Sequence, residues 1–160
     1  GAGAAIAAAL DPETTTICYS TPTGDALLAA RDELVRIKKP GVDQYLLLVT
    51  DGADFDLSCP LPDPLEVLRG LDADGIKTFI VGFGAQDTTP QGVNPPMLNR
   101  MACAGGTAQS FATACSALPT GGFDAVDPSG AHIYFDAANA TELGNALGVI
   151  AGQVCCGCLL

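Results

Sequence analysis

Hydrophobic positions along the chain follow two different periods, which predict alternating helices and strands. Over residues 23–38, apolar side chains recur three or four positions apart, the spacing of a helix with one apolar face. Residues 45–50 form a short continuous apolar run, which is typical of a strand covered on both faces. Polar residues begin directly after this run, so the predicted strand ends at Thr50.

The alternation continues through the rest of the chain. Asp63 is placed to cap a helix that has Pro64 at its first position and ends before Gly75. A strand follows at residues 76–83, and the resulting βαβ unit is expected to cross over right-handedly. The remaining predicted elements are a short helix at 96–103, a strand at 132–135 and a helix capped by Asn139.

This order of elements predicts one α/β domain over residues 1–160, a three-layer α/β/α sandwich with a mostly parallel, Rossmann-like sheet. Residues 1–22 are expected to lead into the first helix. Residues 104–130 are rich in Gly, Ala, Thr and Ser and are expected to form a long loop or hairpin. Ligands of such sheets bind at the carboxyl ends of the strands, which places Asp51 at the expected binding edge.

Several segments form a pattern in their order and spacing. Residues 20–27 hold a threonine in a loop that leads into a helix, and residues 45–52 form an apolar strand ending in Thr-Asp-Gly. Residues 74–84, 98–107 and 134–143 follow as a strand, a helix with its turn, and a last strand with its helix. Together they resemble a von Willebrand factor A-type domain, and the resemblance spans most of the chain.

The resemblance implies a metal-ion-dependent adhesion site. In that family the ligands come from an Asp-x-Ser-x-Ser loop after the first strand, a loop threonine and the aspartate of Thr-Asp-Gly. The matching metal ligands here are Thr21 and Asp51. No Asp-x-Ser-x-Ser occurs in the sequence, so the first strand and its loop are expected to be missing and the domain to be incomplete. The expected cation is Mg²⁺, Ca²⁺ or Mn²⁺ in the complete parent protein, held weakly or not at all by this chain alone.

The resemblance also implies an adhesion or protein-binding module rather than an enzyme, with a protein or an extracellular-matrix ligand as partner. A structural scaffold with a degenerate metal site and a magnesium-dependent chelatase-type enzyme subunit remain as alternatives. Taken alone, Thr21 could cap the helix, as could Thr23, and Asp51 could be a turn residue. His132 has no Gly-x-Ser-x-Gly motif to accompany it, so a hydrolase triad is not indicated.

Charge and cysteine content narrow the partners and the compartment. The net charge of −11 disfavours nucleic acid and anionic membranes as partners, and no apolar run approaches the ~20 residues of a membrane span. Seven cysteines favour an extracellular or cell-envelope location, where disulfides form. Candidate pairs are Cys103 with Cys115 and Cys18 with Cys59. The alanine- and glycine-rich composition hints at a bacterial source.

Overall fold

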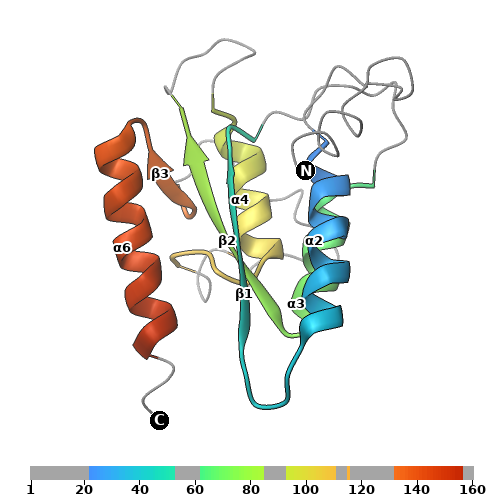
Figure 1. Ribbon diagram of the computed structural model, residues 1–160. Helices are drawn as coiled ribbons and strands as arrows, with labels where there is room; N and C mark the ends of the chain where they lie inside the picture. The colour runs from blue at the N-terminus through green and yellow to red at the C-terminus, as the bar shows by residue number, and fades with distance from the viewer. Residues whose placement is uncertain (1–21, 53–61, 85–92, 111–114, 116–131, 157–160) are drawn as a thin grey trace, which may run out of the picture.

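The computed structural model describes residues 22–52, 62–84, 93–110, 115 and 132–156 of the chain. Within these residues, helices and strands alternate along the sequence (Figure 1). In chain order, the elements are α2 (Thr23–Ile37), β1 (Gln44–Thr50), α3 (Pro64–Ala73), β2 (Ile76–Phe83), α4 (Pro95–Ala104), β3 (Phe135–Ala137) and α6 (Ala140–Cys156). The alternation confirms the predicted α/β class.

The described strands form one parallel sheet in the order β1-β2-β3. β1 pairs with β2 along its whole length, from Gln44 opposite Ile76 to Thr50 opposite Gly82. Because the strands are parallel, their carboxyl ends meet at one edge of the sheet, which lies at the top of Figure 1. Residues that follow these ends are therefore brought close together.

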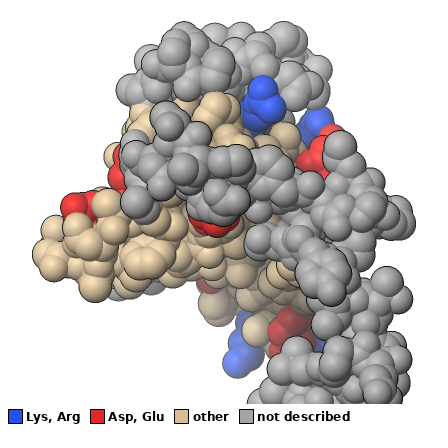
Figure 2. Space-filling model, turned by 90° about the horizontal axis from the view of Figure 1, so that it is seen from above, with Lys and Arg blue, Asp and Glu red and all other residues tan. Residues whose placement is uncertain are grey.

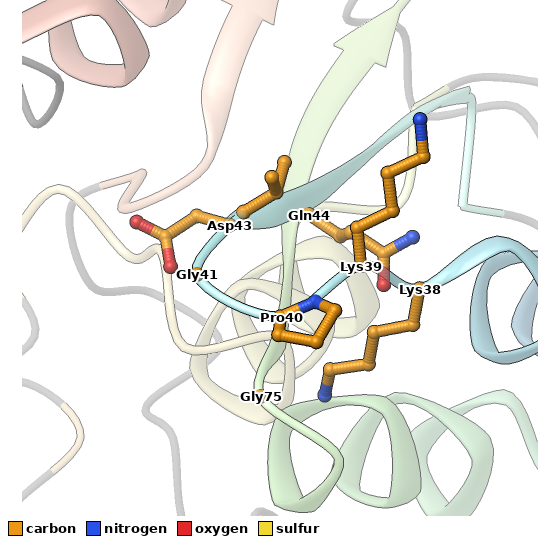
Figure 3. A pocket seen from close by; sticks show the side chains of 8 residues that line it. Lys38, Lys39, Pro40, Gly41, Asp43, Gln44 and Gly75 are labelled. Carbon is orange, nitrogen blue, oxygen red and sulfur yellow. The ribbon is translucent and has the colours of Figure 1, made fainter.

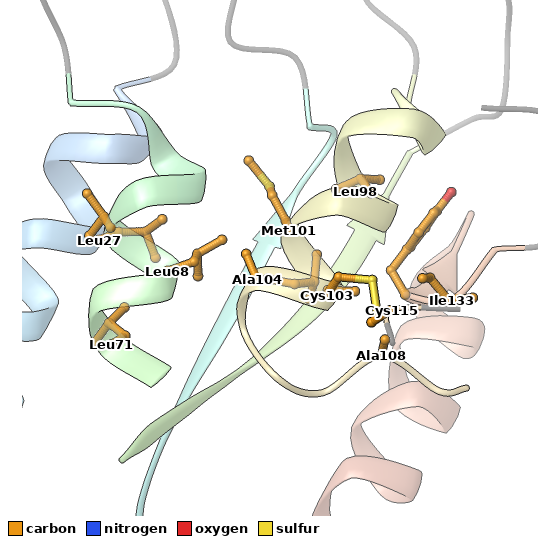
Figure 4. Close-up of a cluster of buried hydrophobic side chains, with 14 of the residues drawn as sticks. Leu27, Leu68, Leu71, Leu98, Met101, Cys103, Ala104, Ala108, Cys115 and Ile133 are labelled. Carbon is orange, nitrogen blue, oxygen red and sulfur yellow. A yellow bond between two sulfur atoms is a disulfide. The ribbon is translucent and has the colours of Figure 1, made fainter. Parts of the chain in front are cut away.

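Helices cover both faces of the sheet, which confirms the three-layer arrangement in the described part of the chain (Figure 1). On one face, α2, α3 and α4 surround a core that includes Leu27, Leu68, Leu71, Ile80, Leu98 and Met101 (Figure 4). On the other face, α6 packs over a core that includes Phe79, Val81, Phe135, Ala146 and Ile150. β2 supplies both cores because successive side chains of a strand point to opposite faces.

The predicted helix caps are confirmed. The Asp63 carboxylate accepts a hydrogen bond from the backbone N–H of Leu65 at 2.9 Å at the start of α3. Gly75 follows α3 with φ +79°, a conformation that suits glycine and ends the helix. At the start of α6, the Asn139 side chain accepts from the backbone N–H of Glu142 at 3.1 Å and donates to the Glu142 carboxylate at 2.7 Å. These local bonds explain why the helices begin where the sequence predicts.

The prediction that the first strand is covered on both faces is wrong. Leu46 and Leu48 pack against the α2–α3–α4 core, but Leu47 is 42% exposed and Val49 is 43% exposed on the α6 side. The reason is the position of α6, which packs against β3 and β2 rather than over β1. Continuous apolar sequence is therefore compatible with a strand that has only one covered face.

The third strand lies later than predicted, at Phe135–Ala137 rather than at residues 132–135. The backbone before it is bonded to other segments instead of to β2. The N–H of Ile133 donates to the Asn99 side chain at 2.9 Å, and the carbonyl of Ile133 accepts from the N–H of Gln109 at 2.8 Å. These tertiary bonds replace strand pairing at residues where the apolar sequence alone predicts it.

Three smaller predictions can also be compared with the structure. α4 begins at Pro95, after an Asn94 cap, and extends one residue past the predicted end. The predicted apolar face of the helix at residues 23–38 is partly wrong, since Ile37 at the end of α2 is 45% exposed. In the predicted loop 104–130, residues 105–110 and Cys115 are described, while 111–114 and 116–130 lie outside the described residues.

Candidate functional site

Asp51 directly follows β1 at the carboxyl edge of the sheet, where the sequence places it. Its neighbour Thr50 lies opposite Gly82 of β2. Figure 2 views the molecule from this side, and both acidic and basic side chains are visible among the described residues. Asp51 itself is partly buried, so its carboxylate belongs to a formed edge rather than to a fully exposed loop.

The backbone around Asp51 is held by the start of α4. The carbonyl oxygen of Asp51 accepts a hydrogen bond from the backbone N–H of Asn94 at 2.8 Å. One residue later, the N–H of Gly52 donates to the Thr50 hydroxyl at 3.1 Å. These two bonds define the turn that carries the carboxylate; the second is local, whereas the first joins β1 to a residue far along the chain, just before α4.

Gly52 is required by this turn for two reasons. Its φ of +79° is a conformation that other residues adopt at a cost. A Cβ atom at this position would also lie 2.8 Å from Cγ of Leu98, which is fully buried in α4. The Thr-Asp-Gly sequence therefore combines a strand end, a carboxylate and the only residue type that lets α4 approach so closely.

A second cluster of polar side chains lies beside this edge. Its members come from β3 and from the residues directly before it. The Nδ1 atom of His132 lies 2.5 Å from a carboxylate oxygen of Asp136, and the His132 ring stacks on Tyr134 with ring centroids 4.9 Å apart. Tyr134 is 1% exposed, and burial raises the pKa of its hydroxyl far above the usual value, with Asp136 adding to the shift. Asp136 lies opposite Gly82, so this group adjoins the carboxyl edge.

The sequence interpretation did not predict this arrangement of His132, Tyr134 and Asp136. The available signal is the spacing of two between His132, Tyr134 and Asp136, which places three side chains on the same face of an extended segment. Gly82 makes room for the buried ring, since a Cβ there would meet Tyr134 and would lie 2.7 Å from Cδ1 of Leu98.

Thr21, the other predicted ligand, lies outside the described residues, so its distance from Asp51 stays a prediction. The helix that follows it begins at Thr23, with Pro22 as the residue before the helix and no side-chain cap. The suggestion that Thr23 caps this helix is therefore wrong. Thr23 is instead the first residue of the helix itself and is 4% exposed.

The donor set that the described residues offer to a metal ion is small. Among them, no group of three or more His, Cys, Asp or Glu side chains could hold an ion together. Asp51 contributes one carboxylate of the hard oxygen type that Mg²⁺ prefers. A magnesium site here would therefore need further oxygen atoms or water molecules in addition to this one carboxylate.

A pocket of about 570 Å³ lies at the opposite end of β1 and is separate from this site (Figure 3). It is lined by the connection from α2 to β1 and by Gly75. The side chains of Lys38 and Lys39 point to different sides of the turn at Pro40 (Figure 3). Lys38 donates to the backbone carbonyl of Asp74 at 2.6 Å, so it has a structural partner at the end of α3.

The predicted disulfide between Cys103 and Cys115 is present, with an S–S distance of 2.04 Å. Both cysteines are buried in the core on the α4 side (Figure 4). The bond ties the end of α4 to the segment that follows it. The other predicted pair, Cys18 with Cys59, lies outside the described residues.

The chain has a parallel three-layer α/β fold with a Thr-Asp-Gly turn at the carboxyl edge of the sheet. The family model for the von Willebrand factor type A domain matches residues 5–118 of the chain. The chain therefore belongs to this family, a family of protein-binding and adhesion modules. The comparisons found no matching curated protein and no matching solved structure. No helix in the described part of the chain is long and apolar enough to cross a membrane.

Proposed function

We propose that this chain is a binding domain that contacts a protein or extracellular-matrix partner through a divalent cation at the carboxyl edge of the sheet. Asp51 is the ligand to the cation, together with Thr21. An open position of the cation would accept a carboxylate from the partner. The proposed activity is binding rather than catalysis.

The single observation that carries this proposal is the placement of Asp51. Its carboxylate follows β1 at the edge where α/β sheets bind ligands, and its backbone is bonded to Asn94 of the α4 cap. Because the backbone of this turn is held, less of the chain has to become ordered when the carboxylate takes up an ion. The net charge of −11 attracts cations to the molecule as a whole, which also supports a divalent cation as the bound ion.

The proposed location is extracellular or in the cell envelope. The buried disulfide between Cys103 and Cys115 supports it, because such bonds persist in oxidising compartments. A basic protein surface is a suitable partner for so acidic a chain, with the cation bridging the carboxylates on the two sides.

The test is a titration with Mn²⁺, followed by the broadening of amide signals in NMR spectra of the whole chain. We expect signals near Thr50 and Gly52 to broaden first and the Asp51→Asn variant to lose this effect. Asp43→Asn is the matched control, because Asp43 is an exposed carboxylate before the opposite end of β1. Broadening that is the same in both variants would contradict the assignment of Asp51.

The affinity for Mg²⁺ gives a second, independent test. The described ligand set is small, so calorimetry should show a dissociation constant of about 1 mM or weaker for the chain alone. Micromolar binding that depends on Asp51 would show that the chain holds a fuller site than we propose. Complete absence of an effect of Asp51 would favour the alternative, a structural scaffold with a degenerate site.

A further inference from the structure

One of the asparagines in the chain begins an Asn-x-Thr sequence. Asn139 is followed by Ala140 and Thr141, and we call these three residues the sequon. The other asparagines, at positions 94, 99 and 145, are each followed two positions later by an apolar residue. Asn-x-Ser/Thr without proline in the middle is the acceptor sequence for N-linked glycans, which are attached at the protein surface. The place of the sequon in the fold therefore decides whether it can be used.

The sequon lies on an exposed turn between β3 and α6. Ala138, the sequon residues and Glu142 are all exposed. The turn directly follows the carboxyl end of β3, at the top of Figure 1, and α6 begins within the sequon at Ala140. A bulky group can therefore be attached to the Asn139 side chain without displacing the core.

The Asn139 side chain caps α6, and it uses its oxygen for this purpose. Oδ1 accepts hydrogen bonds from the backbone N–H groups of Thr141 at 3.0 Å and Glu142 at 3.1 Å. Nδ2 carries two hydrogens, of which one donates to the Glu142 carboxylate at 2.7 Å. The other has no partner among the residues that the structure describes. Glycosylation replaces one hydrogen of Nδ2, so the helix cap and a glycan use different atoms and do not compete.

We propose that Asn139 is the acceptor of an N-linked glycan. In the transfer, Nδ2 of Asn139 forms a bond to the anomeric carbon of an oligosaccharide carried on a polyprenyl diphosphate. The bond between that carbon and the diphosphate breaks, the diphosphate keeps the electron pair, and Nδ2 loses one proton. The product is a substituted amide that keeps one N–H for the Glu142 carboxylate and an unchanged Oδ1 for the cap.

The exposed surface of α6 gives such a glycan a role. The helix carries one charged side chain, Glu142, in its 17 residues from Ala140 to Cys156. Val149 is 54% exposed and Leu147 is 37% exposed, and a Cβ added at the glycines 144, 148 and 152 would meet nothing within 4 Å. Leu147 lies about 10 Å along the helix from Ala140, so a hydrated glycan at the start of α6 shields this weakly polar surface and keeps the chain soluble.

The glycan also has a defined place relative to the proposed metal site. β2 lies between β1 and β3, and the three parallel strands end at the same edge of the sheet. Thr50 of β1 and Asp136 of β3 are both in register with Gly82, so the two outer strands are about 10 Å apart at this edge. A glycan on Asn139 therefore stands on the β3 side of the edge and is compatible with a cation at Asp51.

The test is to express the whole chain behind a secretory leader in eukaryotic cells and to measure its mass before and after treatment with an amidase that removes N-linked glycans. Thr141→Ala removes the hydroxyl that the acceptor sequence requires, and Thr141→Ser keeps it. Both variants leave the cap intact, because Thr141 bonds to Asn139 through its backbone N–H. We expect a glycan on the unchanged chain and on Thr141→Ser, none on Thr141→Ala, and native circular dichroism in all three.

A secreted but unmodified chain would overturn the proposal. A glycan that remains on Thr141→Ala would also overturn it, because the sugar would then be attached elsewhere. Removal of the glycan should increase the light scattering of the chain at high concentration, and unchanged scattering would overturn its role in shielding α6.

The inference rests on the proposed extracellular or cell-envelope location, but its test is independent of the proposed metal site. The leader brings the chain to the glycan donor, and the mass measurement involves neither a cation nor Asp51. An unmodified chain therefore counts against Asn139 alone, whereas loss of the Mn²⁺ effect would count against Asp51 alone.

Discussion

The two faces of the sheet are covered to different extents where β1 contributes to them. On the α4 side, Leu46 and Leu48 pack against a core whose residues Leu68 and Ile80 are fully buried. On the α6 side, Leu47 and Val49 remain more than two-fifths exposed. All four β1 residues belong to one apolar run, so the difference between them comes from the helices around the strand and not from hydrophobicity.

The comparison also bears on function. Asp51 directly follows β1, and its backbone carbonyl is bonded to Asn94. Asn94 caps α4, a helix that covers the packed side of the sheet. The proposed metal site therefore depends on the α4 side of the sheet, which is packed, and not on the exposed α6 side of β1. The following predictions test this division.

The largest expected difference is between two leucine-to-alanine substitutions. Leu68→Ala removes a fully buried side chain from the core on the α4 side and should lower the free energy of unfolding by about 2–5 kcal/mol. Leu47→Ala, on the exposed α6 side of β1, should lower it by less than about 1 kcal/mol. Urea denaturation at low protein concentration measures both. Equal losses would show that the faces are equally packed and would remove the basis of the comparison.

Reduction of the disulfide between Cys103 and Cys115 should lower the free energy of unfolding by a similar amount. The bond joins residues 12 positions apart, and a loop of this size contributes about 3 kcal/mol by restricting the unfolded chain. Thermal unfolding with and without reductant measures the effect. The double substitution of both cysteines by alanine should reproduce it, whereas a melting temperature insensitive to either change would contradict the prediction.

Gly82→Ala should cost about 1–3 kcal/mol, because the added Cβ would meet the buried ring of Tyr134 and the side chain of Leu98. Gly148→Ala is the matched control, since a Cβ at Gly148 in α6 meets nothing within 4 Å. That substitution should raise the stability by about 0.5–1 kcal/mol, because alanine favours a helix more than glycine does. Equal effects at both positions in chemical denaturation would show that the ring has room to move.

The smallest expected effect depends on pH. Burial raises the pKa of Tyr134 in the folded chain, so above the usual tyrosine pKa of about 10 only the unfolded chain loses this proton. The unfolded state then binds fewer protons than the folded state, and the free energy of unfolding falls as the pH rises. Tyr134→Phe should flatten this fall in denaturation curves between about pH 9 and pH 11. Tyr45→Phe, on the α6 side, is the control, and an identical slope in both variants would rule out Tyr134 as its source.

The local signals in the sequence predicted much of the fold correctly. The caps at Asp63 and Asn139 form as expected, because their hydrogen bonds join residues only two or three positions apart. The strand before Asp51 and its parallel neighbour are also confirmed. The start of β3 was wrong because the backbone at Ile133 bonds to Asn99 and Gln109, and no local pattern announces such distant partners.

Prediction of the candidate site was limited in the same way. The Thr-Asp-Gly sequence identified Asp51 and its place at the carboxyl edge, since both follow from the end of an apolar run. The bond from Asn94 to Asp51 and the stacked pair of His132 and Tyr134 were missed, because they require the packing of α4 and β3 against the sheet. The position of Thr21 next to Asp51 remains a prediction.

The order of amino acids by itself determined the alternation of helices and strands, their caps and the family to which the chain belongs. Each of these depends on spacing or on hydrogen bonds within a few residues. Only the tertiary structure decided which face of β1 is covered, where β3 begins and what holds the turn at Asp51. These features depend on where α4 and α6 lie, and the burial of a side chain is a property of its neighbours in space.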